Sequence, residues 1–391
     1  MVRWLGLPLC AFLAACSGTE PGETSDADLD AAVDVATETS GDVGSPDTGD
    51  AVGDTVAPDT GPVAPPPVDG EKPGVDGKQP VSVPAKGEAV FRVETKPGEH
   101  LHFMLTFSPS SQPVVMKVER WTAGARKALG ETDGGGGLRT LAVFDGDAAA
   151  TFWVRVTSTT AFTGTLTITR TPFADGLTCA SDCSHLLQLP LANDPAVDGY
   201  AHDGGTVFRY QFGRRDLLML LRSAGRRMIA MKKLPFYPYD FSQWDGETPG
   251  NDVGAPRHAS HQRGKDVDVS LYGSDGGSAW RSFCTTSSVD GGRACVNGTA
   301  KGLDARATAR ELAGFYEGGI VTMMFLDQEL IELVRPAAGP LAKDGVIATS
   351  LVPLYSDGTH LQHWPNHDNH VHVRVSEAAK LVIGAEPVEP P

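Results

Sequence analysis

A long acidic tract near the start of the 391-residue chain is the feature that most constrains its fold. Residues 17–70 contain thirteen Asp or Glu and no Lys, Arg or His, and no aromatic residue occurs from 17 to 84. Such a stretch buries too little apolar surface to offset the entropy lost on ordering, so we expect a disordered acidic tether over 17–84. The tract contributes −13 of the formal net charge of −16, which leaves −3 for the rest. A near-neutral remainder argues against nucleic-acid binding.

Residues 1–16 predict an export signal. Arg3 precedes a short apolar run, Trp4–Ala15, which is too short to span a bilayer. The end of this run, Leu-Ala-Ala before Cys16, resembles the lipobox of bacterial lipoproteins. That resemblance implies lipidation of Cys16 and a protein anchored to a membrane of the cell envelope, facing the periplasm. Ser17 resembles the pattern of outer-membrane sorting.

Four cysteines remain beyond the signal: Cys179, Cys183, Cys284 and Cys295. An even number in an oxidising compartment predicts disulfides, and three pairings are open. Proximity along the chain favours Cys179–Cys183 and Cys284–Cys295. These spacings are unlike those of a zinc ribbon, so a four-cysteine metal site is disfavoured.

Residues 85–172 predict a β-sandwich. Short alternating runs are separated by Gly, Pro, Ser and Asp clusters, which is typical of a small antiparallel sandwich. We interpret His100 and His102 as a surface pair. The arrangement weakly resembles the accessory β-domains that flank secreted bacterial peptidases. The predicted strands are 89–93, 101–105, 114–118, 152–156 and 164–169.

Residues 175–391 predict a mixed α+β domain. Phe208–Phe212 alternates like a strand. Asp304 is positioned to cap a helix that Gly318 and Gly319 would end. Beyond it we expect a strand over 320–326, a helix over 328–334 and a final strand over 369–375.

Seven of the eleven histidines fall in two short windows, 258–268 and 360–372. A catalytic zinc ion takes three imidazole or carboxylate ligands and keeps one position open. His261 and Asp268 supply one ligand of each type in the first window. In the second window His370 and His372 share a strand face, so that one can bind the metal and the other can lie beside it. Asp266 shares the face of Asp268; we expect it to lie outside the ligand shell or to face solvent.

These windows resemble the paired motif of the LAS zinc peptidases, and most closely the penicillin-insensitive murein endopeptidases. The resemblance rests on His258-Ala-Ser-His261-Gln and on His367-Asp-Asn-His370-Val-His372-Val-Arg374. It implies zinc bound by His261, Asp268 and His372. It further implies catalytic roles for His370, which would take a proton from the attacking water, and for His258 and His367, which would position substrate or stabilise charge. The implied reaction is hydrolysis of the D-Ala to diaminopimelate bond in peptidoglycan cross-links.

Other features depart from the family pattern or lie outside it. Asn369 stands where the dipeptidase branch has a glutamate base, which leaves the base role to a histidine. Arg257 replaces an expected Gly, and the loop 274–299 is particular to this chain, so the preferred bond stays open. His360 and His363 are expected to be structural or loop residues. Three aromatic residues, Tyr237, Tyr239 and Trp244, are candidates to line a groove.

Two alternative functions stay open. One is a related wall hydrolase, either a D,D-carboxypeptidase or a lysostaphin-like enzyme. The other is a wall-binding lipoprotein whose zinc is structural, with four closed protein ligands. The expected partners are peptidoglycan and, through the lipid, a membrane. The sequence does not indicate an oligomeric state.

Overall fold

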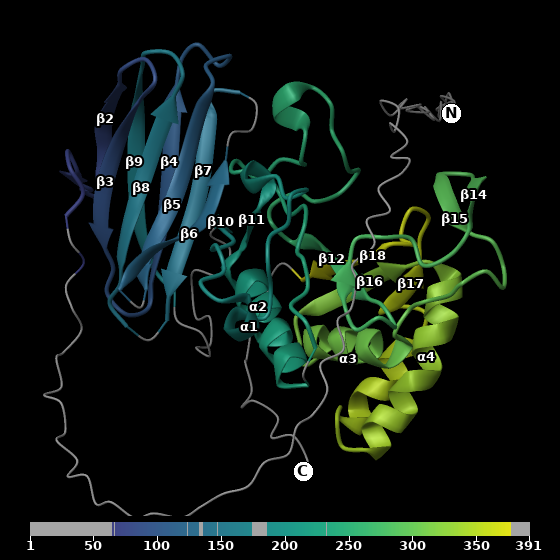
Figure 1. The fold of residues 1–391 in the computed structure, drawn as a ribbon. Helices are drawn as coiled ribbons and strands as arrows, with labels where there is room; N and C mark the ends of the chain where they lie inside the picture. The colour runs from purple at the N-terminus through teal and green to yellow at the C-terminus, as the bar shows by residue number, and fades with distance from the viewer. Residues whose placement is uncertain are drawn as a thin grey trace, which may run out of the picture. The chain divides into compact units, whose positions relative to one another are not determined.

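A computed structural model describes residues 65, 67–122, 124–132, 136–146, 148–173, 186–231 and 233–376. The predicted signal, Cys16, Cys179 and Cys183 lie outside this range. Within it the chain is rich in β-structure, with two stacked sheets followed by a mixed sheet and helices (Figure 1). None of the helices in these residues combines the length and apolar character needed to cross a membrane.

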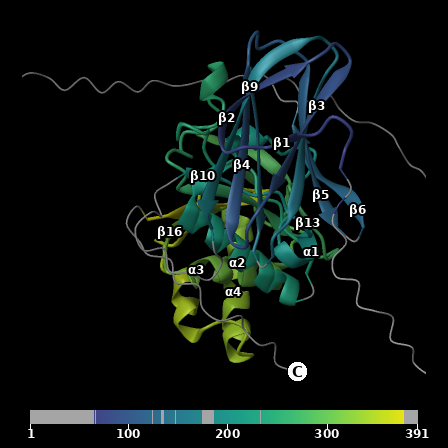
Figure 2. The same cartoon turned by 90° about the vertical axis from the view of Figure 1, so that its left-hand side faces the viewer.

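The first part is a sandwich of two sheets (Figure 2). One has the order β1-β3-β8-β5-β6 and the other β2-β9-β4-β7. Their inward-facing side chains, such as Phe91 and Val154 from one sheet and Phe103 and Leu166 from the other, form one apolar core. The strands are β1 (Lys72–Pro73), β2 (Gly77–Val83), β3 (Gly87–Glu94), β4 (Glu99–Phe107), β5 (Val114–Thr122), β6 (Ala125–Thr132), β7 (Leu138–Asp145), β8 (Thr151–Ser158) and β9 (Phe162–Pro172).

The sandwich confirms the five predicted strands and corrects its predicted start. Strands β1 and β2 lie inside the segment 17–84, which the sequence assigned to a disordered tether. Strand β2 pairs with β9 along its whole length, and Val81 and Val83 enter the core. The alternation of Val81, Ser82 and Val83 is the strand signal that the absence of aromatic residues obscured.

The second part carries a sheet of order β13-β12-β18-β16-β17. Helices α2, α3 and α4 share an apolar core with one face of this sheet, to which Val267, Val269, Val371 and Val373 contribute. The elements are β10 (Leu186–Gln188), α1 (Pro195–Asp198), η1 (Phe208–Tyr210), β11 (Phe212–Arg214), α2 (Arg215–Ala230), η2 (Asn251–Val253), β12 (Asp266–Tyr272), β13 (Ser278–Ala279), β14 (Thr286–Val289), β15 (Gly292–Cys295), α3 (Ala305–Tyr316), β16 (Val321–Leu326), α4 (Gln328–Lys343), η3 (Thr349–Tyr355), β17 (Leu361–His363) and β18 (His370–Val375).

Most local predictions in this part are confirmed. Asp304 is the N-cap of α3, where its side chain accepts a hydrogen bond from the Ala307 amide. The predicted strand over 208–212 is wrong, because Phe208–Tyr210 forms a 3-10 turn and the strand begins only at Phe212. The predicted helix 328–334 is too short, since α4 continues to Lys343 through two internal prolines.

The two predicted surface histidines of the sandwich are buried where it meets the following segment. His100 is 0% exposed, and its Nε2 hydrogen-bonds the Gln188 carbonyl oxygen at 2.8 Å. His102 is partly buried and lies 2.6 Å from the Thr140 hydroxyl through its Nε2. The surface interpretation of this pair is therefore wrong, because β10 covers His100 and the Phe212 ring of β11 packs on His102.

Candidate metal centre

The face of the second sheet opposite the helices carries the histidines and carboxylates. In the antiparallel pair β12–β18, Asp266 lies opposite Arg374, Asp268 opposite His372 and Ser270 opposite His370. Valines at the alternating positions point the other way, into the core. The period of a strand therefore places one set of polar side chains on a single face, as the sequence predicted for His370 and His372.

The three residues predicted to bind metal converge on one point. His261 Nε2 is 3.0 Å from His372 Nδ1 and 3.3 Å from Asp268 Oδ1, and the latter two atoms are 3.0 Å apart. All three residues are at most 3% exposed. Donors that bind one tetrahedral zinc ion at its usual bond lengths lie about 3.3–3.6 Å apart. The spacing of these three atoms fits one small cation.

A hydrogen bond behind each of the two histidines directs its other ring nitrogen toward the centre. His261 Nδ1 lies 3.0 Å from the Phe241 carbonyl oxygen, and His372 Nε2 lies 3.0 Å from Asp266 Oδ1. Each of these oxygens accepts the proton of the ring nitrogen that it faces, so His261 Nε2 and His372 Nδ1 are the nitrogens left to bind a metal. These two nitrogens and the Asp268 carboxylate face one another. Without a metal, a protonated His372 supplies the positive charge beside Asp268, and a bound cation would take the place of that proton.

Local backbone geometry brings His261 into this position. His261 lies in the loop before β12 with φ of 68°, in the left-handed region that non-glycine residues seldom adopt. Its amide donates to Asp266 Oδ2 at 3.1 Å, which fixes the turn. Asp266 thus holds both ligating histidines and also pairs with Arg374. The predicted position of Asp266 outside the ligand shell agrees with these contacts, but it is buried and does not face solvent.

The pKa values of His372 and Asp268 in the metal-free site follow from the same contacts. Burial disfavours a charged His372 ring, but the hydrogen bonds and charges of Asp266 and Asp268 outweigh it and raise the pKa of His372 to about 9. Burial likewise opposes ionisation of Asp268, and the surrounding histidines hold its pKa well below its usual value. The site therefore favours positive charge at its centre.

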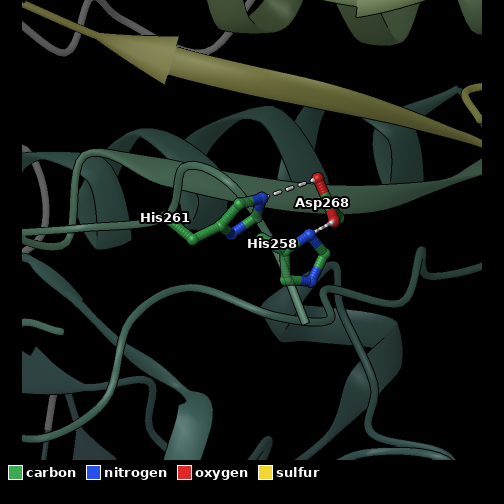
Figure 3. Close-up of side chains that lie close together, drawn as sticks. All are labelled: His258, His261 and Asp268. Atoms are coloured by element: carbon green, nitrogen blue, oxygen red, sulfur yellow. Dashed lines mark ion pairs between the residues drawn. The ribbon is translucent and has the colours of Figure 1, made fainter. Parts of the chain in front are cut away.

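His258 stands on the other side of the same carboxylate (Figure 3). Its Nδ1 is 3.9 Å from Asp268 Oδ2, and its ring centroid is 4.1 Å from that of His261. Donor atoms of His258, His261 and Asp268 all lie within 4.8 Å of one another. His258 is a quarter exposed, and its Nε2 pairs with Asp240 at 2.8 Å. It flanks the metal position from the solvent side.

His370 and His367 flank the centre on the strand side. His370 Nε2 is 3.6 Å from Asp268 Oδ1, and its Nδ1 is 2.7 Å from Asn369 Oδ1. The His367 ring lies 4.6 Å from that of His370. Burial is the main reason why the pKa of His370 falls well below its usual value and that of His367 falls to about 4. Both rings are neutral near pH 7, as a proton acceptor requires.

Two residues of this site were not predicted from the sequence. Asp240 is buried and accepts from His258; the sequence gives it no motif and places it far upstream. Trp280 stacks on His370 with centroids 4.3 Å apart and planes 9° apart, and the Tyr239 ring packs against it at 4.4 Å. The position of Tyr239 beside the site agrees with its predicted role as a lining residue. An aromatic side chain in a loop carries no signal of what it will stack on.

The other residues singled out in the sequence have contacts of their own. Cys284 and Cys295 form a disulfide, as predicted. His360 and His363 take no part in the histidine cluster: the former pairs with Asp357, and the latter accepts from the Gln328 amide. Tyr237 pairs through its amide with the Ser270 hydroxyl, and Trp244 is 52% exposed.

Comparisons with known proteins add little to this geometry. No protein-family model matches the chain, and no curated protein matches it. Solved structures match about a quarter of it. They include the pre-peptidase C-terminal domain of a Bacillus anthracis collagenase (7% identity, 25% of this chain and 92% of the other, TM-score 0.21). Another is a periplasmic inhibitor of g-type lysozyme from Aeromonas hydrophila (14%, 26% and 96%, TM-score 0.20). A third is a surface-associated copper-binding protein of Methylomicrobium album (11%, 25% and 96%, TM-score 0.21). At these scores the likenesses carry no argument about function.

Proposed function

We propose that the chain is a zinc-dependent peptidase of the LAS type that hydrolyses the D-Ala to diaminopimelate cross-links of peptidoglycan. The observation that carries the proposal is the convergence of His261 Nε2, His372 Nδ1 and Asp268 Oδ1 at 3.0–3.3 Å, with the outer ring nitrogens bonded to the Phe241 carbonyl and to Asp266. Two imidazoles and one carboxylate are the ligand types of catalytic zinc sites. The three further histidines around them supply proton acceptors and charge.

The chemistry can be assigned to residues of this chain. When bound, zinc supplies a Lewis acid that polarises an amide carbonyl and acidifies water. His370 accepts the proton as the water oxygen bonds to the carbonyl carbon, and its lone pair is available because Asn369 Oδ1 accepts from its other nitrogen. The proton then passes to the leaving amine as the C–N bond breaks. His258, held by Asp240, stabilises the negative charge that develops on the carbonyl oxygen.

The surroundings of the centre favour an enzyme over a structural zinc site. A structural ion is closed by four protein ligands, whereas a catalytic ion keeps a position open. His258 is the nearest candidate for a fourth ligand, because its donor atoms lie within 4.8 Å of those of His261 and Asp268. We place it on the open side of the centre because its side chain is a quarter exposed, whereas the three proposed ligands are at most 3% exposed. The remaining position is left to water and substrate. The envelope location and the lipid anchor at Cys16 are part of the same proposal and rest on the sequence.

The test is a digest of purified cross-linked peptidoglycan by the full chain, followed by mass spectrometry. Conversion of cross-linked dimers to monomers, abolished by a chelator and restored by zinc, is the expected result. Release of single D-Ala with the dimers intact would identify a carboxypeptidase instead. Intact dimers and no released D-Ala, from a folded protein loaded with zinc, would contradict the proposal.

A further inference from the structure

A disulfide-closed hairpin is attached to the loop that carries His367. Strands β14 and β15 form a two-stranded ribbon that stands out from the sheet in Figure 1, and the Cys284–Cys295 disulfide closes its base. The hairpin is also held at the disulfide itself, where the Cys295 amide donates to Asp327 Oδ2 at 2.9 Å. The base of the hairpin is thus held both by a disulfide and by a hydrogen bond to Asp327.

Arg293 of β15 contacts both neighbours of His367. Its amide donates to Asn366 Oδ1 at 2.9 Å, and its carbonyl accepts from the Asn366 amide at 2.8 Å. Its Nε donates to Asp368 Oδ1 at 2.9 Å. The residues immediately before and after His367 are therefore both bonded to one arginine.

The contact with Arg293 matters because Asp368 is a buried carboxylate. Its side chain is 0% exposed, whereas that of Arg293 is 44% exposed. Its second oxygen, Oδ2, has no hydrogen-bond partner among the described residues. A buried carboxylate without a cation is strongly unfavourable, so the position of Asp368 depends on Arg293.

The loop position in turn sets the place of His367. The His367 ring is within 4.6 Å of the His370 ring and 5.9 Å of the His372 ring, measured between centroids. The backbone on either side is held as well, since the His367 carbonyl accepts from the Asp327 amide and the Asp368 carbonyl from the Phe283 amide. A shift of this loop by about 1 Å would displace His367 enough to lower a reaction rate by about a hundredfold.

We propose that Arg293 is a positioning residue that acts through Asp368 to hold His367 beside the metal centre, with the disulfide-closed hairpin as its support. The role of His367 in the reaction rests on the proposed function above. The positioning itself is a property of the structure and is measurable without any substrate.

Arg281 provides a matched control in the same loop region. Its side chain is 45% exposed and pairs with Asp275 at 2.7 Å, so it resembles Arg293 in exposure and pairing. Its partner differs, because the Asp275 side chain is 55% exposed while that of Asp368 is fully buried. Arg293→Ala and Arg281→Ala therefore remove the same group from a buried and from an exposed carboxylate.

The first experiment is hydrogen exchange, followed by mass spectrometry, on the full chain. Arg293→Ala is expected to raise the exchange rates of the Asn366, Asp327 and Phe283 amides at least about tenfold, because it lowers the free energy of local opening there. Exchange rates in other segments should not change. Arg281→Ala is expected to leave the Asn366 and Asp327 amides unchanged; the Phe283 amide is left out of this comparison because the Arg281 guanidinium lies 5.3 Å from the Phe283 ring. If Arg293→Ala changes none of these amides, or if Arg281→Ala changes the Asn366 and Asp327 amides equally, the positioning role is wrong. If Arg293→Ala does not fold, the double variant Arg293→Gln with Asp368→Asn takes its place, because it replaces the ion pair by a neutral hydrogen bond. We expect the double variant to keep these amides protected from exchange. If it folds and the amides are not protected, the proposal is wrong.

The second experiment measures peptidoglycan cleavage and zinc content together. Arg293→Ala should lower kcat at least about tenfold with KM nearly unchanged and zinc still bound, and Arg293→Lys should recover part of the loss. In a His367→Ala background the same Arg293 change should have no further effect on kcat. A full additional loss in that background would overturn the route through His367. An inactive wild-type protein would contradict the proposed function alone, because the exchange result stands by itself.

Discussion

His372 and Asp268 lie directly opposite each other across the antiparallel strands β12 and β18, with His372 Nδ1 and Asp268 Oδ1 3.0 Å apart. Both strands send alternate valines into the helical core, so the register of the whole sheet fixes this pair. A slip of one residue on either strand would place a valine where a ligand belongs. The same register therefore sets both the core and the candidate metal centre.

The first prediction is that His372→Ala abolishes tight zinc binding and peptidoglycan cleavage. The change removes one of three ligands and leaves His261 and Asp268 with an incomplete set. Zinc content measured by mass spectrometry after dialysis should fall from one ion per chain to nearly none. His360→Ala is the control, because His360 pairs with Asp357 away from the centre. Cleavage retained by His372→Ala would refute the assignment.

Asp266→Asn should weaken zinc binding about 10–100-fold without removing a ligand. Asp266 accepts from His372 Nε2 and from the His261 amide, so it orients the His372 ring and fixes the turn that carries His261. Competition with a chromophoric chelator measures the affinity. Asp275→Asn, which alters an exposed carboxylate paired with Arg281, should leave the affinity unchanged. An equal affinity for Asp266→Asn and the wild type would show that Asp266 does not orient the ligands.

Glu311 should make the fold less stable as the pH rises. Its side chain is fully buried in α3, neither carboxylate oxygen has a hydrogen-bond partner among the described residues, and burial raises its pKa well above the usual value. The folded state then holds the proton more tightly than the unfolded state, so stability is lost from about pH 4.5 upward. Glu311→Gln removes this loss, and we expect it to stabilise the protein at pH 8 more than at pH 5.

Urea unfolding of the wild type and of Glu311→Gln at pH 5 and pH 8 measures this effect. The difference in unfolding free energy between the two proteins should grow with pH. The exposed Glu332, changed to Gln, is the control and should show no such growth. A constant difference for Glu311→Gln would mean that the carboxyl group finds a partner in solution.

The strands and the convergence of the three proposed ligands were predictable from sequence, whereas the residues that support them were not. His261, Asp268 and His372 stand in two short windows with strand alternation, and alternation is the same in sequence and structure. Two of these supports, Asp240 and Trp280, lie in loops, and a third, Arg293, lies in β15. Their contacts depend on tertiary packing alone. The early start of the sandwich was missed because the alternation of Val81, Ser82 and Val83 in β2 is short and stands in a tract without aromatic residues, and because the two-residue strand β1 is defined only by its pairing with β3.

The last prediction concerns acid stability at the junction of the sandwich with β10. Burial is the main cause that lowers the pKa of His100 to about 4 and that of His102 to about 3. An unfolded histidine takes up a proton near pH 6.5, so the unfolded state binds more protons than the folded state below that pH. The contribution of these histidines to stability is then fully present above about pH 6.5 and falls as the pH drops toward 4.

Thermal unfolding at pH 7.5 and pH 5 should show this decline in the wild type. His102→Gln should show less of it, because the glutamine side chain does not titrate. The exposed His363, changed to Gln, should leave the decline unchanged, and an identical decline in His102→Gln would place the acid sensitivity elsewhere.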